Sequence, residues 1–296
     1  MPGQTQDSAA TRAPRPRESP LALGVRRILR RPTSRVAFFV LGIIVLVGLL
    51  APLVAPYNPS AQPDIVRLKD LAPSLAHPFG TDPYSRDVLS RVIYGARLSL
   101  MIGVLATIVS LTFGVAYGAI SGYAGGFLDS VMMRVLDAFL SIPRLLLLIG
   151  VLVAWPDLSI GALVVFLGLT GWFGVSRIVR GQVLALKHAE FVTAAQALGA
   201  SRRRILWRHL LPNLVSPIVV AATLGVAHVI VLEAGLSYLG IGVRPPLASW
   251  GNIIQDGADQ PSTLWWMSLF PGLFMVLTVM TLNILGEALR DSNDRR

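Results

Sequence analysis

Residues 190–213 read EFVTAAQALGASRRRILWRHLLPN, a stretch that is too polar to cross a membrane and too regular to be a plain loop. Helix-forming residues fill positions 190–198, and Gly199 is a residue type that commonly ends a helix. Ser201 is a favourable N-cap for a second helix, which Pro212 would limit. The stretch therefore predicts a helix–turn–helix elbow, with small residues on its first arm and arginines on its second.

Two interpretations of this elbow are open on the residues alone. Small side chains such as Ala194 and Ala195 allow another backbone to come close, so the elbow would act as a rigid lever that a partner protein grips. Alternatively, Arg203, Arg204 and Arg208 would contact anionic lipid headgroups from an amphipathic helix at the membrane surface.

The chain around the elbow is strongly apolar. Of its 296 residues 53% are hydrophobic and 14% are charged, with a mean hydropathy of +0.63, whereas soluble domains carry about 25% charged residues. So much apolar surface cannot be buried in a water-soluble core, which predicts an all-α integral membrane protein. The net charge of +10 would suggest nucleic acid binding in a soluble protein. Here we assign it to arginines on the cytoplasmic membrane surface and expect no nucleic-acid partner.

Six apolar stretches approach the roughly 20 residues that cross the hydrocarbon layer. The third has a clear apolar run only over 145–155, so we expect it to begin earlier, near Phe139. Two amphipathic segments, 85–97 and 127–140, are expected to lie along the membrane interface. The six predicted transmembrane helices cover approximately 36–56, 98–120, 139–155, 160–176, 214–232 and 267–285.

Lysine and arginine residues predict the orientation of the spans. They are concentrated before the first span and in 177–213, so both termini are expected in the cytoplasm, with 57–97 and 236–266 facing outward. The predicted organisation is a cytoplasmic N-terminal tail (1–35), a first transmembrane helix (36–56), an extracytoplasmic segment (57–97), a transmembrane domain (98–290) that contains the loop 190–213, and a C-terminal tail (291–296).

The fifth span carries His228 and ends at Glu233, and ionisable groups inside membranes are functional candidates. Five residues separate them by about 140° around a helix, so they do not share one face. Glu233 is either a polar residue at the outer interface or a contact for a substrate ammonium group or gate. His228 is either a core or pore-wall residue or part of the pathway. The spacing of Gly114 and Gly118 predicts a close helix contact.

Several classes of protein are disfavoured by what the sequence lacks. An ion-coupled secondary transporter would need its own intramembrane ion site, and such carboxylates are scarce in these spans. The chain has no cysteine, no HExxH spacing and no GxxxxGK[ST]. We therefore expect no metal site, no ATP hydrolysis by this chain and no enzymatic activity.

The elbow resembles the signature loop of binding-protein-dependent ABC permeases. Alanines at 194–195, three residues, glycine at 199, nine residues and H-x-L-P at 209–212 match the pattern E-A-A-x-x-x-G, nine residues, I-x-L-P. Thr193 stands where glutamate is usual, and His209 stands where isoleucine is usual. Segments 77–97, 125–143 and 236–251 further resemble the C-type permeases of dipeptide and oligopeptide uptake, in the order of that family, so the resemblance covers about residues 30–290.

The resemblance implies a type I (MetI-like) permease of an ATP-driven importer in the inner or plasma membrane of a prokaryote, forming half of the pathway for dipeptides or oligopeptides. Nickel or another small solute is the alternative substrate. The implied partners are a B-type permease, two ATP-binding subunits that hold ATP and Mg, an extracytoplasmic solute-binding protein and membrane lipid, with no cofactor in this chain. The implied coupling residues are Ala194, Ala195, Gly199, Arg203, Arg204 and Pro212, and the candidates for pathway or gate are His228 and Glu233.

Overall fold

The structure is a computed structural model that describes residues 31–291. Most of the predicted tail 1–35 and almost all of the predicted tail 291–296 therefore lie outside the described residues. The described chain is helical apart from its loops and one isolated bridge between Thr81 and Asp87. Its helices are α2 (Pro32–Leu49), α3 (Ala51–Val54), α4 (Val88–Ala124), α5 (Gly126–Leu140), α6 (Arg144–Ala154), α7 (Ile160–Leu186), α8 (Glu190–Ala197), α9 (Arg202–Ile205), the π-helical η1 (Leu206–Leu210), the 3₁₀-helical η2 (Leu211–Leu214), α10 (Val215–Tyr238), α11 (Trp250–Asp256) and α12 (Trp265–Asp291).

Five helical segments of the described chain are long and apolar enough to cross a membrane, and a bent pair makes six if it counts as one span. The five are α2, α4, α7, the segment Arg202–Tyr238 that ends in α10, and α12. The pair is α5 and α6, which meet at an angle of 70°. The predicted all-α architecture with six spans is confirmed in this sense, with the third span broken rather than straight.

The third span needs both of its arms. With 11 residues, α6 covers only about 16 Å, roughly half of the hydrocarbon layer. Its partner α5 runs antiparallel alongside α7, because Asp129 pairs with Arg180 near one end while Phe139 stacks on Phe173 near the other. The prediction that residues 127–140 lie along the membrane surface is therefore wrong.

The prediction that residues 85–97 lie along the membrane interface is also wrong. Residues from Val88 onward form the first turns of α4 and continue directly into the second span. The physical reason is that Arg86 and Arg91 are buried against carboxylates of the protein and do not face lipid headgroups.

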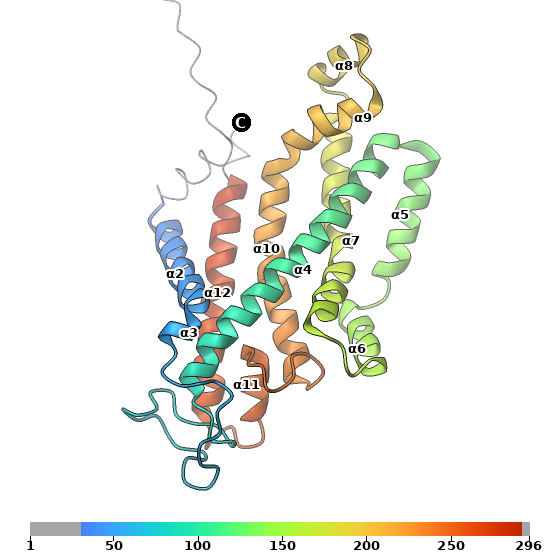
Figure 1. Ribbon diagram of the computed structural model, residues 1–296. Coiled ribbons are helices and arrows are strands. Elements are labelled where there is room, and N and C mark those ends of the chain that lie inside the picture. The colour runs from blue at the N-terminus through green and yellow to red at the C-terminus, as the bar shows by residue number, and fades with distance from the viewer. Residues whose placement is uncertain (1–30, 292–296) are drawn as a thin grey trace, which may run out of the picture.

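The elbow helices and the two ends of the described chain lie at the same end of the molecule (Figure 1). There, Arg31 at the start of α2 donates to Asp291 at the end of α12, at 2.8 Å. The 55–87 segment and α11 lie at the opposite end. This arrangement agrees with the orientation that the arginine distribution predicts, with the elbow and both ends on the cytoplasmic side.

Close packing of α4 against α7 forms the centre of the fold. Gly114, Gly118 and Gly122 lie four residues apart on α4 and face the backbone of α7. A Cβ at Gly114 would lie 2.9 Å from the carbonyl oxygen of Trp172, and one at Gly122 would lie 2.9 Å from that of Arg180. The predicted close contact at Gly114 and Gly118 is confirmed, since only the absence of side chains allows this approach.

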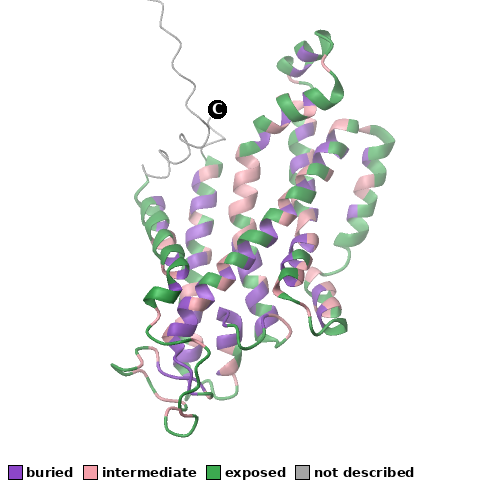
Figure 2. Cartoon of the chain, in the orientation of Figure 1, coloured by how far each residue is buried: buried purple, intermediate pink, exposed green. Residues whose placement is uncertain are grey.

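The remaining spans surround this pair. On the other side of α4, α10 packs against both α4 and α12, and α2 covers α12 and α4. Figure 2 shows buried residues where α4, α7, α10 and α12 face one another, whereas α2 and α5 are exposed over much of their surface. In isolation the chain thus leaves extensive apolar surface for lipid or for other subunits.

The glycine contact makes a testable difference between two positions. Gly118→Ala should lower the thermal stability of the purified chain, because the added methyl group overlaps the α7 backbone and overpacking costs about 1–3 kcal/mol. Gly174→Ala on α7 is the control, since nothing lies within 4 Å of its Cβ position. Thermal unfolding in detergent, followed by size-exclusion chromatography, should separate the two variants. Equal melting temperatures would contradict the close contact.

Candidate functional site

The elbow at the cytoplasmic end has the predicted turn and cap. The chain turns after α8 at Gly199, whose φ of +78° is a backbone conformation that residues with a Cβ rarely adopt. The Ser201 hydroxyl then accepts a hydrogen bond from the backbone N–H of Arg204 at 3.4 Å, which caps α9. Both features follow from local sequence, which explains why they could be predicted.

Pro212 does not end the second arm, contrary to the prediction. The helical path continues from Arg202 through η1 and η2 into α10, with its winding changing from π to 3₁₀ around the proline. A proline lacks the N–H needed for an α-helical hydrogen bond, so the helix changes geometry there. Asn213 supports this turn by donating from its side chain to the carbonyl oxygen of His209 at 2.6 Å. The second arm is therefore continuous with a membrane span.

One face of the elbow is anchored in the protein. Most of its buried residues pack in a single apolar cluster with residues of α4 and α7. The cluster comprises Val192, Ile205, Leu210 and Leu214 from the elbow and its continuation, with Ala119, Val179 and Val183 from the two spans. Displacing the elbow relative to these spans would expose this cluster, so the elbow and the cytoplasmic ends of α4 and α7 form one rigid unit.

The opposite face of the elbow is exposed and apolar at three positions. Phe191, Leu198 and Trp207 are 41%, 88% and 65% exposed. The predicted residues divide between the two faces, since Ala195 is buried and Ala194 is exposed. The remaining predicted coupling residues, Gly199, Arg203, Arg204 and Pro212, are also exposed.

Sequence reasoning missed the three large apolar residues of the exposed face. It considered only the small residues of the first arm and the arginines of the second. Phe191 and Leu198 stand out as large apolar residues in an arm that is otherwise rich in alanine. That contrast was the available signal.

Beneath the elbow, a partly buried ion pair joins three helices. Arg180 of α7 donates twice to Asp129 of α5, from Nε and Nη2, each at 2.6 Å. The hydroxyl of Ser121 on α4 also donates to this carboxylate. Bidentate pairing of this kind holds both groups in a defined orientation, so it fastens α5 to the α4–α7 pair.

Glu233 and His228 occupy different environments, as their helical separation predicts. The Glu233 side chain is fully buried and accepts hydrogen bonds from the hydroxyls of Ser99 at 3.0 Å and Ser237 at 2.6 Å. Ser237 in turn accepts from the backbone N–H of Val243 at 2.9 Å. Glu233 therefore joins α4 and α10 to the loop before α11 and faces neither solvent nor a pathway in this conformation. His228, in contrast, is exposed.

Four buried charges fasten the extracytoplasmic end. Arg86 and Arg91 each contact both Asp82 and Asp256, at distances between 2.5 and 2.8 Å. The two arginines and two aspartates balance in charge, and Asp256 ends α11, 165 residues from Arg91 along the chain. Sequence reasoning missed this cluster because its members come together only through the tertiary fold.

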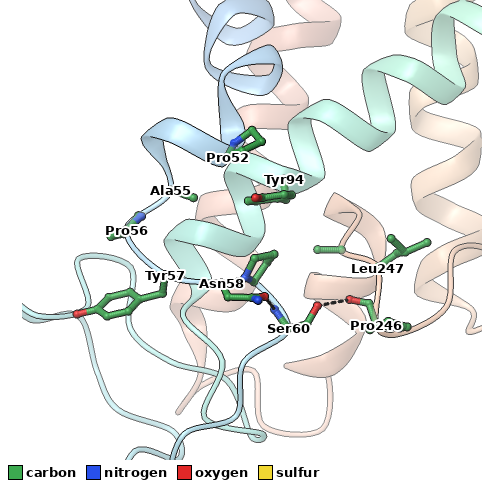
Figure 3. Close-up of a pocket in the computed structure, with 11 residues that line it drawn as sticks. Pro52, Ala55, Pro56, Tyr57, Asn58, Ser60, Tyr94, Pro246 and Leu247 are labelled. Atoms are coloured by element: carbon green, nitrogen blue, oxygen red, sulfur yellow. Dashed lines mark hydrogen bonds between the residues drawn. The ribbon is translucent and has the colours of Figure 1, made fainter.

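A cavity of about 530 Å³ lies near this cluster at the extracytoplasmic surface (Figure 3). It is formed by the chain that follows α3, by Tyr94 of α4 and by the loop at Pro246, where the Ser60 hydroxyl donates to the Pro246 carbonyl oxygen at 3.1 Å. None of its lining side chains is charged. Within residues 31–291, no group of three or more His, Cys, Asp or Glu residues is arranged to hold a metal ion. The cavity thus offers a recessed surface for contact but no catalytic set.

Comparison with known proteins identifies the relatives of this chain. Residues 114–296 match the family described as binding-protein-dependent transport system inner membrane component, and residues 19–78 match the N-terminal TM domain of oligopeptide transport permease C. The dipeptide transport system permease protein DppC of Bacillus subtilis is 39% identical over 272 residues, which cover 91% of this chain and 83% of that protein. The oligopeptide transport system permease protein OppC of the same organism is 40% identical over 261 residues, covering 88% and 85%.

A solved structure resembles the fold. A chain from inward-facing conformations of the MetNI methionine ABC transporter superposes with a TM-score of 0.58 at 18% sequence identity. The match covers 70% of this chain and 98% of that chain. At this level of identity it supports the fold, and it agrees with the predicted MetI-like architecture.

The extracytoplasmic charge cluster leads to a second prediction. Asp256→Asn should destabilise the chain strongly, by about 3–5 kcal/mol, because it leaves two arginines buried with a single counter-charge. Asp157→Asn is the matched control. Asp157 is fully exposed, and its single ionic contact within the described chain, with Arg244, is long at 3.6 Å. Exposed pairs contribute about 0–1 kcal/mol. Urea unfolding in detergent should distinguish the variants, and similar midpoints would show that the cluster does not hold this end together.

Proposed function

The chain belongs to the family of binding-protein-dependent transport system inner membrane components, and from that premise we propose how it operates as a permease subunit of a peptide ABC importer. It is a multi-pass inner-membrane protein and a non-catalytic subunit of such a system. The family implies ATPase and binding-protein partners. The predicted peptide-permease family and membrane location are thus confirmed.

The exposed face of the elbow is proposed to bind an ATPase subunit. Three large apolar side chains, Phe191, Leu198 and Trp207, are exposed on the elbow, whose helices α8 and α9 lie at the cytoplasmic end (Figure 1). Clustered apolar side chains on a water-facing surface are typical of protein contacts. Arg203 and Arg204, exposed beside them, would pair with acidic groups of the partner or with lipid headgroups.

The observation that carries this proposal is the unbroken helical path from Arg202 to Tyr238. Because the second arm runs directly into α10, a movement of the elbow would be transmitted to a membrane span without a flexible linker. The buried cluster at the elbow would carry the ends of α4 and α7 with it. ATP-driven closure of the ATPase subunits would then rotate these spans as a rigid body and alternate access to the pathway.

The remaining partners are proposed from the family. Two ATP-binding subunits would hold ATP and Mg, with no cofactor in this chain, and a second permease of the B type would complete the pathway. The extracytoplasmic segment 57–97 and the neighbouring uncharged cavity would face the solute-binding protein. The substrates would be dipeptides or oligopeptides, with nickel or another small solute as the alternative.

A pair of glycines tests the coupling role of the elbow. Gly199→Asp should abolish peptide import and lower ATPase co-purification at least tenfold, while the chain stays in the membrane. Gly240→Asp is the matched control, because Gly240 has a φ of +76°, similar to the +78° of Gly199, and both have open space around the Cβ position. Gly240 lies just after α10, at the extracytoplasmic end, so its variant should retain the ATPase subunits.

Pull-down from solubilised membranes and uptake of a labelled dipeptide are the two measurements. Normal import by the Gly199 variant, or an equal loss of ATPase subunits in both variants, would rule out the coupling assignment. If substitutions that remove the charges of Arg203 and Arg204 abolished peptide import while Gly199→Asp did not, the lipid-contact interpretation of the elbow would be favoured instead.

A further inference from the structure

Three polar residues from three different spans lie at the same depth. Thr170 is ten residues from the extracytoplasmic end of α7, and His228 is ten residues from that of α10. Arg144, at the start of α6, lies beside Thr170, because its Nε donates to the Thr170 hydroxyl at 3.1 Å. Ten residues of α-helix rise about 15 Å, which is half of the hydrocarbon thickness of roughly 30 Å. All three therefore lie near the middle of the membrane.

Arg144 has no acidic partner at this depth within residues 31–291. Its Nε donates to the Thr170 hydroxyl at 3.1 Å and its Nη2 donates to the Leu167 carbonyl oxygen at 2.7 Å. The absence of a side chain at Gly171 makes room for the guanidinium, since a Cβ there would lie 3.0 Å from Nη2. These contacts are neutral and use two of the five N–H groups of an arginine. The charge of Arg144 is thus positioned but not balanced.

His228 lies near this charge. It is exposed on α10, and it is close enough to Arg144 for the two groups to interact electrostatically. Histidine is mostly neutral at pH 7, so it offers its ring nitrogens for hydrogen bonding and not a second charge. By contrast, Arg180 in the cytoplasmic half and Arg91 at the extracytoplasmic end both have aspartate partners. Ionisable groups inside membranes usually pair with one another or mark a substrate route. Arg144 has no acidic partner in the described chain, so it fits the second case.

The backbone next to Arg144 indicates that this face does not contact lipid. Residues 141–143 separate α5 from α6 at a bend of 70°, and all three are exposed in the described chain. Non-helical backbone at this depth is tolerated only where it is covered by protein or lines a water-filled cavity. Broken helices near the midplane are also where transporters place substrate sites. The broken span and the exposed histidine therefore indicate that another subunit or a hydrated route covers this face beside α6 and α10. The charge of Arg144, which has no acidic partner in the described chain, favours the hydrated route.

We propose that Arg144, with the neighbouring His228 as a neutral hydrogen-bonding group, forms a cationic site in the translocation pathway that receives a carboxylate of the passing substrate, in a peptide its C-terminal carboxylate. This inference rests on the proposed function, since it names the group of the peptide that this chain contacts. A carboxylate would supply the missing counter-charge and accept from the free N–H groups of the guanidinium. The site would favour peptides with a free carboxyl terminus over their amides.

The first experiment compares two peptides in the complete transporter. The complex of both permeases, the ATPase subunits and the binding protein, reconstituted in liposomes, would be assayed for import of a dipeptide and of its C-terminal amide. Arg144→Met should lower the ratio of free to amidated import by roughly tenfold relative to the wild type. Arg144→Lys should retain most of the preference, because it keeps the charge. Selection by the binding protein is the same for all variants and cancels in this comparison.

A matched control is available in the same broken span. Arg134 is exposed on α5, and Arg134→Met makes the same change of charge, so this variant should keep the wild-type ratio. An equal loss of import for both peptides in Arg144→Met would mean a structural role and would overturn the proposal. Import of neither peptide by the wild type would count against the proposed peptide function, and the cationic site would then be judged by the second experiment.

The second experiment does not depend on the substrate. Because the chain contains no cysteine, His228→Cys introduces the single thiol of this chain, and its labelling in the assembled complex can be read from the band of this subunit after gel electrophoresis. The quantity measured is the ratio of the labelling rate with a negatively charged sulfonate reagent to the rate with a trimethylammonium reagent. This ratio should be several-fold higher at His228→Cys than at Leu75→Cys, where the original side chain is fully exposed. Adding Arg144→Met should remove this preference. A thiol that does not react, or a preference that Arg144→Met leaves unchanged, would overturn the cationic site.

Discussion

The close approach of α4 and α7 is the contact on which the other features depend. Three glycines on α4 bring the two backbones together, and the features at the elbow use the surface that this approach creates. The elbow packs on the cytoplasmic ends of both helices, and Asp129 joins α5 to the pair through Arg180. Without a hydrophobic effect between helices in lipid, such contacts must come from close packing and hydrogen bonds. Glycine is therefore a structural requirement at these positions.

Along the membrane normal, the charges near the two ends of the molecule are balanced, whereas the charge in the middle is not. At the extracytoplasmic end, two arginines and two aspartates cancel one another, and beneath the elbow Arg180 is balanced by Asp129. These neutral groups can fasten helices without attracting a substrate. Halfway across, Arg144 is held only by neutral oxygens, which keep it oriented and leave its charge uncompensated. A charge in that position has an energetic cost unless a counter-ion from elsewhere visits it.

The elbow illustrates how an irregular helix can serve mechanical continuity. The π and 3₁₀ segments around Pro212 change the winding without breaking the path, so the exposed Trp207 of the elbow and the mid-membrane His228 belong to one continuous helical element. The third span behaves differently, since its path is interrupted at 141–143 and bends by 70°. One span is thus suited to transmit motion, and the other to present a charged side chain at its break.

The sequence by itself determined the features that depend on local chemistry. Apolar length indicated the spans, arginine distribution indicated their orientation, and the residues around Gly199 and Ser201 predicted the turn and cap of the elbow. These follow from backbone preferences and from the cost of exposing polar groups to lipid. Only the tertiary structure decided which charges are balanced. Arg91 finds Asp256 across 165 residues, Glu233 finds Ser99 across 134, and Arg144 finds no acid in the described chain. Such pairings depend on how helices distant in sequence are packed, because an ionic contact is set by a few ångströms in space and leaves no periodic pattern along the chain.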